Sequence, residues 1–209
     1  MADETAVACV SGQIASGLVD CTTDVSALDS RGRWVVVIDF EGTAQCLRFS
    51  QWQPGSPADI AHAWSGPSTQ SYVSSLDRGQ YIQAVEKVRD SIADGTLYQA
   101  NICRVLDAGM PDPDRADVMG LAALLELHNR APYASSIRVP SAGIEIASAS
   151  PELYLGRKGR SLRSGPIKGT ARTAEELTAK DRAENVMIVD LVRNDPSPMP
   201  NPGPATVPA

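Results

Sequence analysis

The chain has 209 residues, of which 43% are hydrophobic and 21% charged, with a formal net charge of −6. These values are typical of a soluble globular protein with one sizeable domain or two small ones. The acidic balance and the lack of a basic stripe argue against nucleic-acid binding, because domains that track phosphates carry a basic excess on one face.

The sequence shows neither a membrane span nor a secretory signal. No run approaches the roughly 20 apolar residues that a span needs, and the start, MADETAVACVSG, lacks a basic region followed by an apolar run. The four cysteines, Cys9, Cys21, Cys46 and Cys103, are widely spaced and have two histidines as possible metal-binding companions. This pattern predicts buried free thiols in a cytoplasmic protein rather than a metal site.

The first half of the chain predicts one strand, one long connection and one helix. Residues 33–40, RWVVVIDF, form an apolar run that indicates a well-buried strand, with a turn at Glu41 and Gly42. Residues 51–75 are rich in breakers and predict a connecting loop, at which we place a boundary. An apolar stripe then predicts an amphipathic helix that ends near Gly95. The stripe consists of Tyr81, Val85, Val88 and Ile92.

The second half alternates helices with short strands. Residues 97–106, LYQANICRVL, predict a strand whose polar face, with Gln99, needs solvent or a lined cavity. A helix over 114–129, four short runs that suggest an antiparallel meander, and a helix over 174–192 follow. The order of elements favours an α+β fold. Six prolines in residues 196–209 predict a flexible tail.

Three residues could carry chemistry. Small and apolar neighbours would leave the Glu152 carboxylate poorly hydrated, which favours a general acid, although a strand-edge glutamate facing water is the better interpretation of this residue alone. Lys168 lies between Ile167 and Gly169, where desolvation would free its amine for nucleophilic attack, although most loop lysines are solvated. Glu184 shares its helix face with apolar residues, so it is expected to need a cation or a metal.

Three blocks around these residues resemble the chorismate-utilising enzymes, which include anthranilate, aminodeoxychorismate, isochorismate and salicylate synthases. The blocks are GQYIQAVEKVRDSIADGTLYQANICR, SASPELYLGRKGRSLRSGPIKGTAR and KDRAENVMIVDLVRND. The resemblance implies the chorismate-binding fold, with antiparallel β-sheets and outer helices. It also implies that residues 1–74 are a variable N-terminal region, 75–195 the N-terminal half of the chorismate-binding domain, and 196–209 an atypical proline-rich tail.

Two positions sort the chemistry within that family. Isochorismate and salicylate synthases have a lysine where this chain has Gln99, so Gln99 implies an ammonia-using enzyme with this side chain at the substrate. The loop sequence PIKGT resembles aminodeoxychorismate synthases, whereas anthranilate synthases have PIAGT. By this resemblance Lys168 is the nucleophile that attacks C2 of chorismate before ammonia enters at C4. The expected product is 4-amino-4-deoxychorismate for p-aminobenzoate and folate synthesis.

The resemblance gives roles to the remaining candidates. Glu152 matches the general acid that protonates the departing hydroxyl, and Glu184 matches a glutamate that binds Mg²⁺. Gly169 and Thr170 belong to the loop that closes over the substrate. A glutamine amidotransferase subunit is the expected source of ammonia.

Two alternatives stay open: an anthranilate synthase component I that carries lysine in the loop, and a non-catalytic fragment. Family members continue beyond the last of these three blocks, and after residue 195 the sequence departs from the family pattern. We therefore expect a truncated chain that is unstable and inactive by itself.

Overall fold

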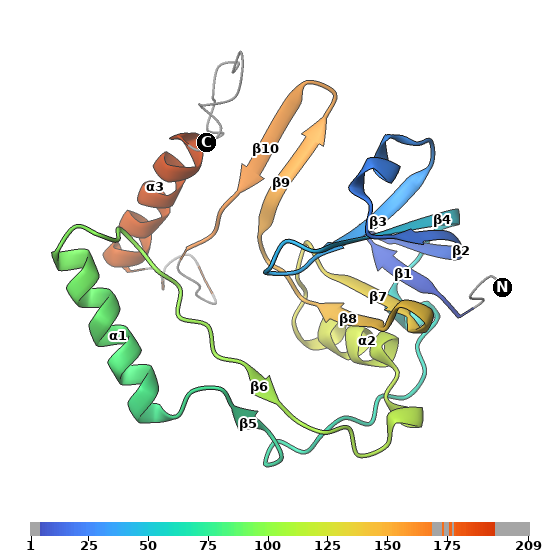
Figure 1. Cartoon of the computed structure of the whole chain (residues 1–209), viewed down its shortest axis with the longest axis horizontal. Coiled ribbons are helices and arrows are strands. Elements are labelled where there is room, and N and C mark those ends of the chain that lie inside the picture. Colours follow the sequence, from blue (N-terminus) through green and yellow to red (C-terminus); the bar gives the residue numbers. More distant parts are fainter. Residues whose placement is uncertain (1–4, 169–172, 174–175, 177, 195–209) are drawn as a thin grey trace.

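A computed structural model describes residues 5–168, 173, 176 and 178–194. Its main feature is a curled antiparallel sheet of six strands in the order β3-β4-β2-β1-β7-β8 (Figure 1). These strands are β1 (Val7–Val10), β2 (Gln13–Thr22), β3 (Arg33–Ile38), β4 (Ala44–Pro54), β7 (Ser135–Val139) and β8 (Ile144–Ser148). The sheet draws strands from both sides of residue 75. The predicted α+β class is confirmed.

Helix α2 (Val118–His128) packs against β7 and β8. The side chain of Asp117 caps its N-terminus by accepting a hydrogen bond from the Met119 N–H at 3.1 Å. Met119 is fully buried and accepts a hydrogen bond from the Ser136 hydroxyl, with 3.2 Å between Oγ and Sδ. The predicted helix over 114–129 is thus confirmed, with a later start because a separate 3₁₀ turn occupies Pro113–Arg115.

Alternate residues of the central strand β1 enter two apolar clusters, as the two faces of a strand require. Ala8 joins the cluster on one face, which also contains Leu47 and Phe49. Val7 and Cys9 join the other cluster, with Met119 of α2. Because β1 contributes to both clusters, the core of the described chain is centred on β1.

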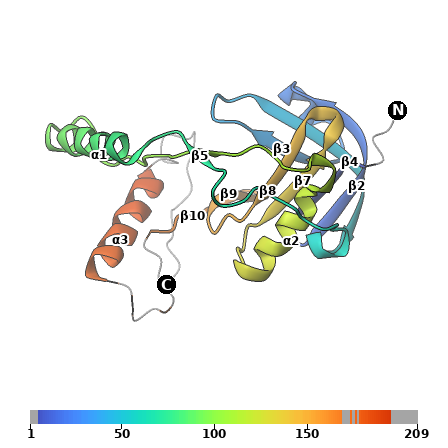
Figure 2. The same cartoon turned by 90° about the horizontal axis from the view of Figure 1, so that it is seen from below.

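The remaining elements form a second region, which we call the arm and define as the described residues within 73–107 and 150–194. It contains β5 (Val73–Ser74), α1 (Arg78–Ala93), β6 (Leu106–Asp107), β9 (Leu153–Lys158), β10 (Ser161–Gly165) and α3 (Ala179–Asn194). Figures 1 and 2 show α1 and α3 at the end of the molecule remote from the six-stranded sheet. Short 3₁₀ helices occupy Val25–Asp29, Pro57–Asp59 and Pro140–Ala142. Among the described residues, no helix combines the length and apolar character needed to cross a membrane.

The predicted helix near residue 81 is confirmed as α1. Asp77 and Gln80 form a capping box at its start, and Gly95 takes a positive φ of 73° just after its end. The helix over 174–192 is confirmed from residue 179 onward. The four runs of the predicted meander do form antiparallel pairs, but β7–β8 belongs to the large sheet and β9–β10 stands as a separate pair.

Burial of residues 33–40 was predicted wrongly. The strand β3 exists, but it lies at the edge of the sheet and pairs with β4 alone. Val35 is buried, whereas Ile38 is 66% exposed and Phe40 fully exposed. An apolar run alone does not distinguish an edge strand from a central one.

The predicted strand over 97–106 was also wrong. Strand structure is confined to Leu106–Asp107, which pairs with β5, and Gln99 is exposed in an irregular segment. A strand needs a neighbour to accept and donate its backbone hydrogen bonds, and residues 97–105 have no strand partner in the described part of the chain. The loop predicted over 51–75 begins later, because β4 continues to Pro54.

The sequence reasoning missed the β1–β2 hairpin. Its turn is Ser11-Gly12, and both residues have positive φ, 53° and 71°. This is the backbone of a type I′ turn, which favours glycine and fits the twist of a two-residue hairpin. The Ser-Gly pair between Val10 and Gln13 is therefore the signal that could have predicted it.

Candidate functional site

The hairpin β9–β10 brings Glu152 and the Lys168 loop together. Leu153 pairs with Gly165, so the residues just before β9 lie beside those just after β10. The Ile167 N–H donates a hydrogen bond to Glu152 Oε1 at 3.3 Å. One hairpin thus brings together Glu152 and Lys168, which are sixteen residues apart in the sequence.

Lys168 is half-buried, and its backbone also contacts α3. Its N–H donates a hydrogen bond to Asn185 Oδ1 at 3.0 Å. Two consecutive backbone N–H groups, of Ile167 and Lys168, are therefore satisfied by side chains from two different elements.

An open hollow of about 320 Å³ joins the Lys168 loop to the segment that carries Gln99. It is lined by Lys168, by Ile188 and Leu191 of α3, and by residues 98–101. Gln99 and Lys168, which are 69 residues apart in the sequence, thus border one space. Gln99 and Asn101 border this space together with Tyr98 and Ala100, so residues of both predicted faces line it and the segment is not a strand.

Glu152 does not lie in the poorly hydrated setting that its neighbours suggested. Its side chain is exposed, because it precedes β9 at the open end of a two-stranded hairpin whose faces are largely exposed. The backbone of Glu152 is tied to Ser150, whose hydroxyl donates to the Glu152 carbonyl at 3.1 Å. The carboxylate is held near the Lys168 loop but remains in water.

Glu184 lies on α3, one turn before Ile188. Its carboxylate pairs with the Lys180 ammonium at 3.5 Å, and its side chain is 39% exposed. Ile188 and Leu191, which were predicted to share a helix face with Glu184, both line the hollow. Glu184 is not among the residues that line it. Within the described residues no group of three or more His, Cys, Asp or Glu could hold a metal ion.

Gly169 and Thr170, the other two predicted substrate-binding residues, lie outside the described residues. The four cysteines are free; Cys9 and Cys46 are buried as predicted, whereas Cys21 and Cys103 are exposed.

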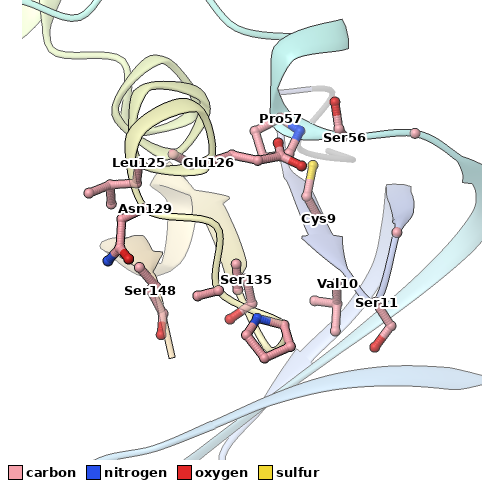
Figure 3. A pocket seen from close by; sticks show the side chains of 17 residues that line it. Cys9, Val10, Ser11, Ser56, Pro57, Leu125, Glu126, Asn129, Ser135 and Ser148 are labelled. Carbon is pink, nitrogen blue, oxygen red and sulfur yellow. The ribbon is translucent and has the colours of Figure 1, made fainter. Parts of the chain in front are cut away.

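A second cavity, of about 220 Å³, lies between α2, the β1–β2 turn and the ends of β7 and β8 (Figure 3). Polar residues from five separate segments line it: Cys9, Ser56, Glu126, Asn129, Ser135 and Ser148. Burial raises the pKa of the Cys9 thiol, with Glu126 and Asp59 adding to the rise and a hydrogen bond to Ser136 opposing it. The thiol is therefore protonated at neutral pH and is a poor nucleophile. No short motif marks this cavity, which explains why sequence reasoning missed it.

The chorismate binding enzyme family matches residues 23–209 of this chain. The chain is 37% identical to the chloroplastic aminodeoxychorismate synthase of Arabidopsis thaliana over 158 residues, which cover 69% of this chain and 17% of that protein. It is 34% identical over 147 residues to anthranilate synthase component 1 of Streptomyces coelicolor, covering 65% of this chain and 28% of that protein.

A third relative is aminodeoxychorismate synthase component 1 of Klebsiella aerogenes, which is 28% identical over 193 residues, or 84% of this chain and 41% of the relative. The chain thus spans less than half the length of these three relatives. No solved structure matches it. The match over residues 23–209 shows that the chain belongs to the chorismate binding enzyme family.

Proposed function

We propose that this chain carries part of a chorismate-aminating site of the aminodeoxychorismate synthase component I type, with Lys168 as its nucleophile. The observation that supports this most directly is the shared hollow: Lys168 and Gln99 both border it, and the residue before Lys168 is hydrogen-bonded to Glu152. Two successive displacements on one ring require a nucleophile and an acid that protonates the leaving hydroxyl, and Gln99 places a polar amide at the same hollow.

The first displacement forms a bond between the Lys168 nitrogen and C2 of chorismate. The two ring double bonds shift away from C2, and the bond between C4 and its hydroxyl oxygen breaks. Glu152 would give its proton to that oxygen, so that water leaves. Ammonia then adds at C4, the double bonds shift back, and the Lys168 amine departs from C2 with its electron pair. The product is 4-amino-4-deoxychorismate.

The exposed position of Glu152 sets a condition on this proposal. Water surrounds the exposed carboxylate, so proton transfer from Glu152 to the departing hydroxyl requires that bound substrate, or a segment that covers it, removes this water. The proposal therefore needs a closed state in which Glu152 is less exposed than it is here. Gly169 and Thr170 would belong to the loop that closes.

Glu184 would provide one carboxylate to Mg²⁺. The donor chemistry fits, because Mg²⁺ binds through one or two carboxylates with water and substrate oxygens completing its shell. Glu184 would exchange its contact with Lys180 for the metal. When bound, the ion would hold the ring carboxylate of chorismate.

The other parts of the proposal rest on the family resemblance. A glutamine amidotransferase subunit would supply the ammonia, and the product would serve p-aminobenzoate and folate synthesis in the cytoplasm. The 34% identical anthranilate synthase component 1 supports a second candidate, amination at C2 to give the ortho product. Lysine at position 168 favours the para product.

The test is to incubate the 209-residue chain with chorismate, ammonium and Mg²⁺, and to map its peptides by mass spectrometry. We expect the Lys168 peptide to gain the mass of chorismate minus water without turnover by this chain alone, and a protein extended to the length of its relatives to give the para isomer. Lys168→Ala should abolish both. An ortho product that persists in the alanine variant would favour the anthranilate synthase activity. A folded chain that neither binds chorismate nor forms the adduct would favour the non-catalytic interpretation.

A further inference from the structure

The loop that carries Lys168 is held by side chains rather than by a sheet. Residues 166–168 follow β10 and have left its ladder, so the N–H groups of Ile167 and Lys168 need other acceptors. Glu152 Oε1 accepts from Ile167 and Asn185 Oδ1 accepts from Lys168, at 3.3 and 3.0 Å. The second contact is the shorter, and it is part-buried.

Asn185 also connects this loop to the helix face that borders the hollow. It lies three residues before Ile188, and residues at this spacing are neighbours on a helix surface. Ile188 and Leu191 line the hollow together with Lys168. The hydrogen bond at Asn185 therefore fixes the Lys168 backbone against the same helix face that its side chain must reach.

The position of a lysine amine depends strongly on such an anchor. The side chain has four carbons and rotates freely, so the backbone position decides which space the amine can reach. A misplacement of about 1 Å can cost a reaction about 100-fold.

We propose that Asn185 is a positioning residue, which holds the Lys168 amine in the hollow by accepting the hydrogen bond of the Lys168 N–H. This inference rests on the proposed function of Lys168. It predicts that position 185 needs a side-chain oxygen, so aspartate can replace asparagine whereas leucine cannot.

The test compares the chain with its Asn185→Leu and Asn185→Asp variants. Val186→Leu is the matched control, because Val186 is the next residue of α3 and is 67% exposed. Each protein is acetylated at trace level with acetic anhydride over a range of pH, and the four lysines, Lys87, Lys158, Lys168 and Lys180, are quantified by mass spectrometry. Lys158, on an exposed hairpin, is the internal reference.

In Asn185→Leu we expect the labelling ratio of Lys168 to Lys158 to move at least threefold from its original value, and the profile of this ratio over the pH range to change with it. In Asn185→Asp and in Val186→Leu, the labelling ratio and its pH profile should stay as in the original chain. Circular dichroism checks that α3 remains helical. If leucine at 185 leaves the ratio and the profile unchanged, or if aspartate changes them as much as leucine does, the proposal is overturned.

If circular dichroism shows that Asn185→Leu has lost helix α3, Asn185→Ala takes its place in the test. Alanine favours the helix and also lacks the side-chain oxygen. The labelling needs no chorismate, so it separates the two proposals. A Lys168 adduct with unchanged labelling in the leucine variant would contradict the positioning role alone. Changed labelling without any adduct would contradict the chorismate chemistry alone.

Discussion

The six-stranded sheet with α2 and the arm differ sharply in packing. Among the described residues, all buried hydrophobic side chains lie within residues 6–49 and 118–144. In the arm no residue of α1 is buried, and large apolar side chains such as Tyr98 and Tyr154 are 69% and 89% exposed. The predicted site residues that the structure describes, Gln99, Glu152, Lys168 and Glu184, all lie in the arm. Stability and the candidate chemistry therefore reside in different parts of the molecule.

This division means that a substitution in the sheet should act on folding and one in the arm on the site. It also bears on the expectation that the chain is unstable by itself. Exposed apolar side chains of the arm, including Val73, Val105 and Tyr154, form the kind of surface that promotes association. That expectation remains a prediction.

The largest effect on stability should come from the sheet. Leu47 is fully buried in β4, so Leu47→Ala should lower the free energy of unfolding by about 2–5 kcal/mol through lost burial and the cavity left behind. Urea denaturation followed by circular dichroism measures it. The control is Ile38→Ala on the neighbouring edge strand, where 66% exposure predicts a loss below about 1 kcal/mol. Similar losses in both variants would show that the sheet does not hold the core.

A smaller effect should come from Asp117, which joins α2 to the sheet. Its carboxylate lies 2.7 Å from the Arg138 guanidinium, and its side chain is 9% exposed. Burial alone would raise its pKa, but hydrogen bonds from the His62 and Met119 N–H groups together with Arg138 outweigh burial and lower it. Asp117→Asn would keep one acceptor and leave Arg138 without its charge partner, at a cost of about 1–3 kcal/mol.

The lowered pKa also predicts a pH dependence. A carboxyl whose pKa is lower in the folded state stabilises the fold above its unfolded pKa, near 3.9, and loses that contribution as pH falls through the folded pKa. Unfolding free energy measured from pH 6 down to the acid limit of folding should fall more steeply in the original chain than in Asp117→Asn. Parallel curves would contradict the role of this pair.

Local patterns in the sequence predicted what depends on local structure. The stripe from Tyr81 to Ile92 and the stop at Gly95 gave α1, because helical hydrogen bonds lie within one segment. The strand over 97–106 failed, because alternation shows only that a segment can pair and not that a partner lies beside it. The edge position of β3 was hidden for the same reason.

The site shows the same limit. The proximity of Glu152 and Lys168 follows from pairing the runs ELYLG and RSLRS, which are both visible in the sequence. The hollow shared by Gln99 and Lys168 also needs α3 and residues 98–101 to border one space, and no local pattern encodes that. Asn185 could not be predicted as an anchor, since one asparagine in a helix carries no signal of what its side chain accepts.

The smallest effect we predict tests whether the arm responds separately from the sheet. Asp77 Oδ1 accepts a hydrogen bond from the Gln80 N–H at 2.8 Å, and Gln80 Oε1 accepts one from the Asp77 N–H at 2.9 Å. Asp77→Ala removes this cap, at a cost of about 1 kcal/mol. Because α1 buries no residue, we expect amide hydrogen exchange to rise about fivefold in its first turns while β1, β2 and β4 keep their protection.

Gln83→Ala, an exposed change within the same helix, should leave both regions unchanged. If the cap variant also speeds exchange in the sheet, then the two regions fold as one cooperative unit, and substitutions in the arm cannot be interpreted as acting on the site alone.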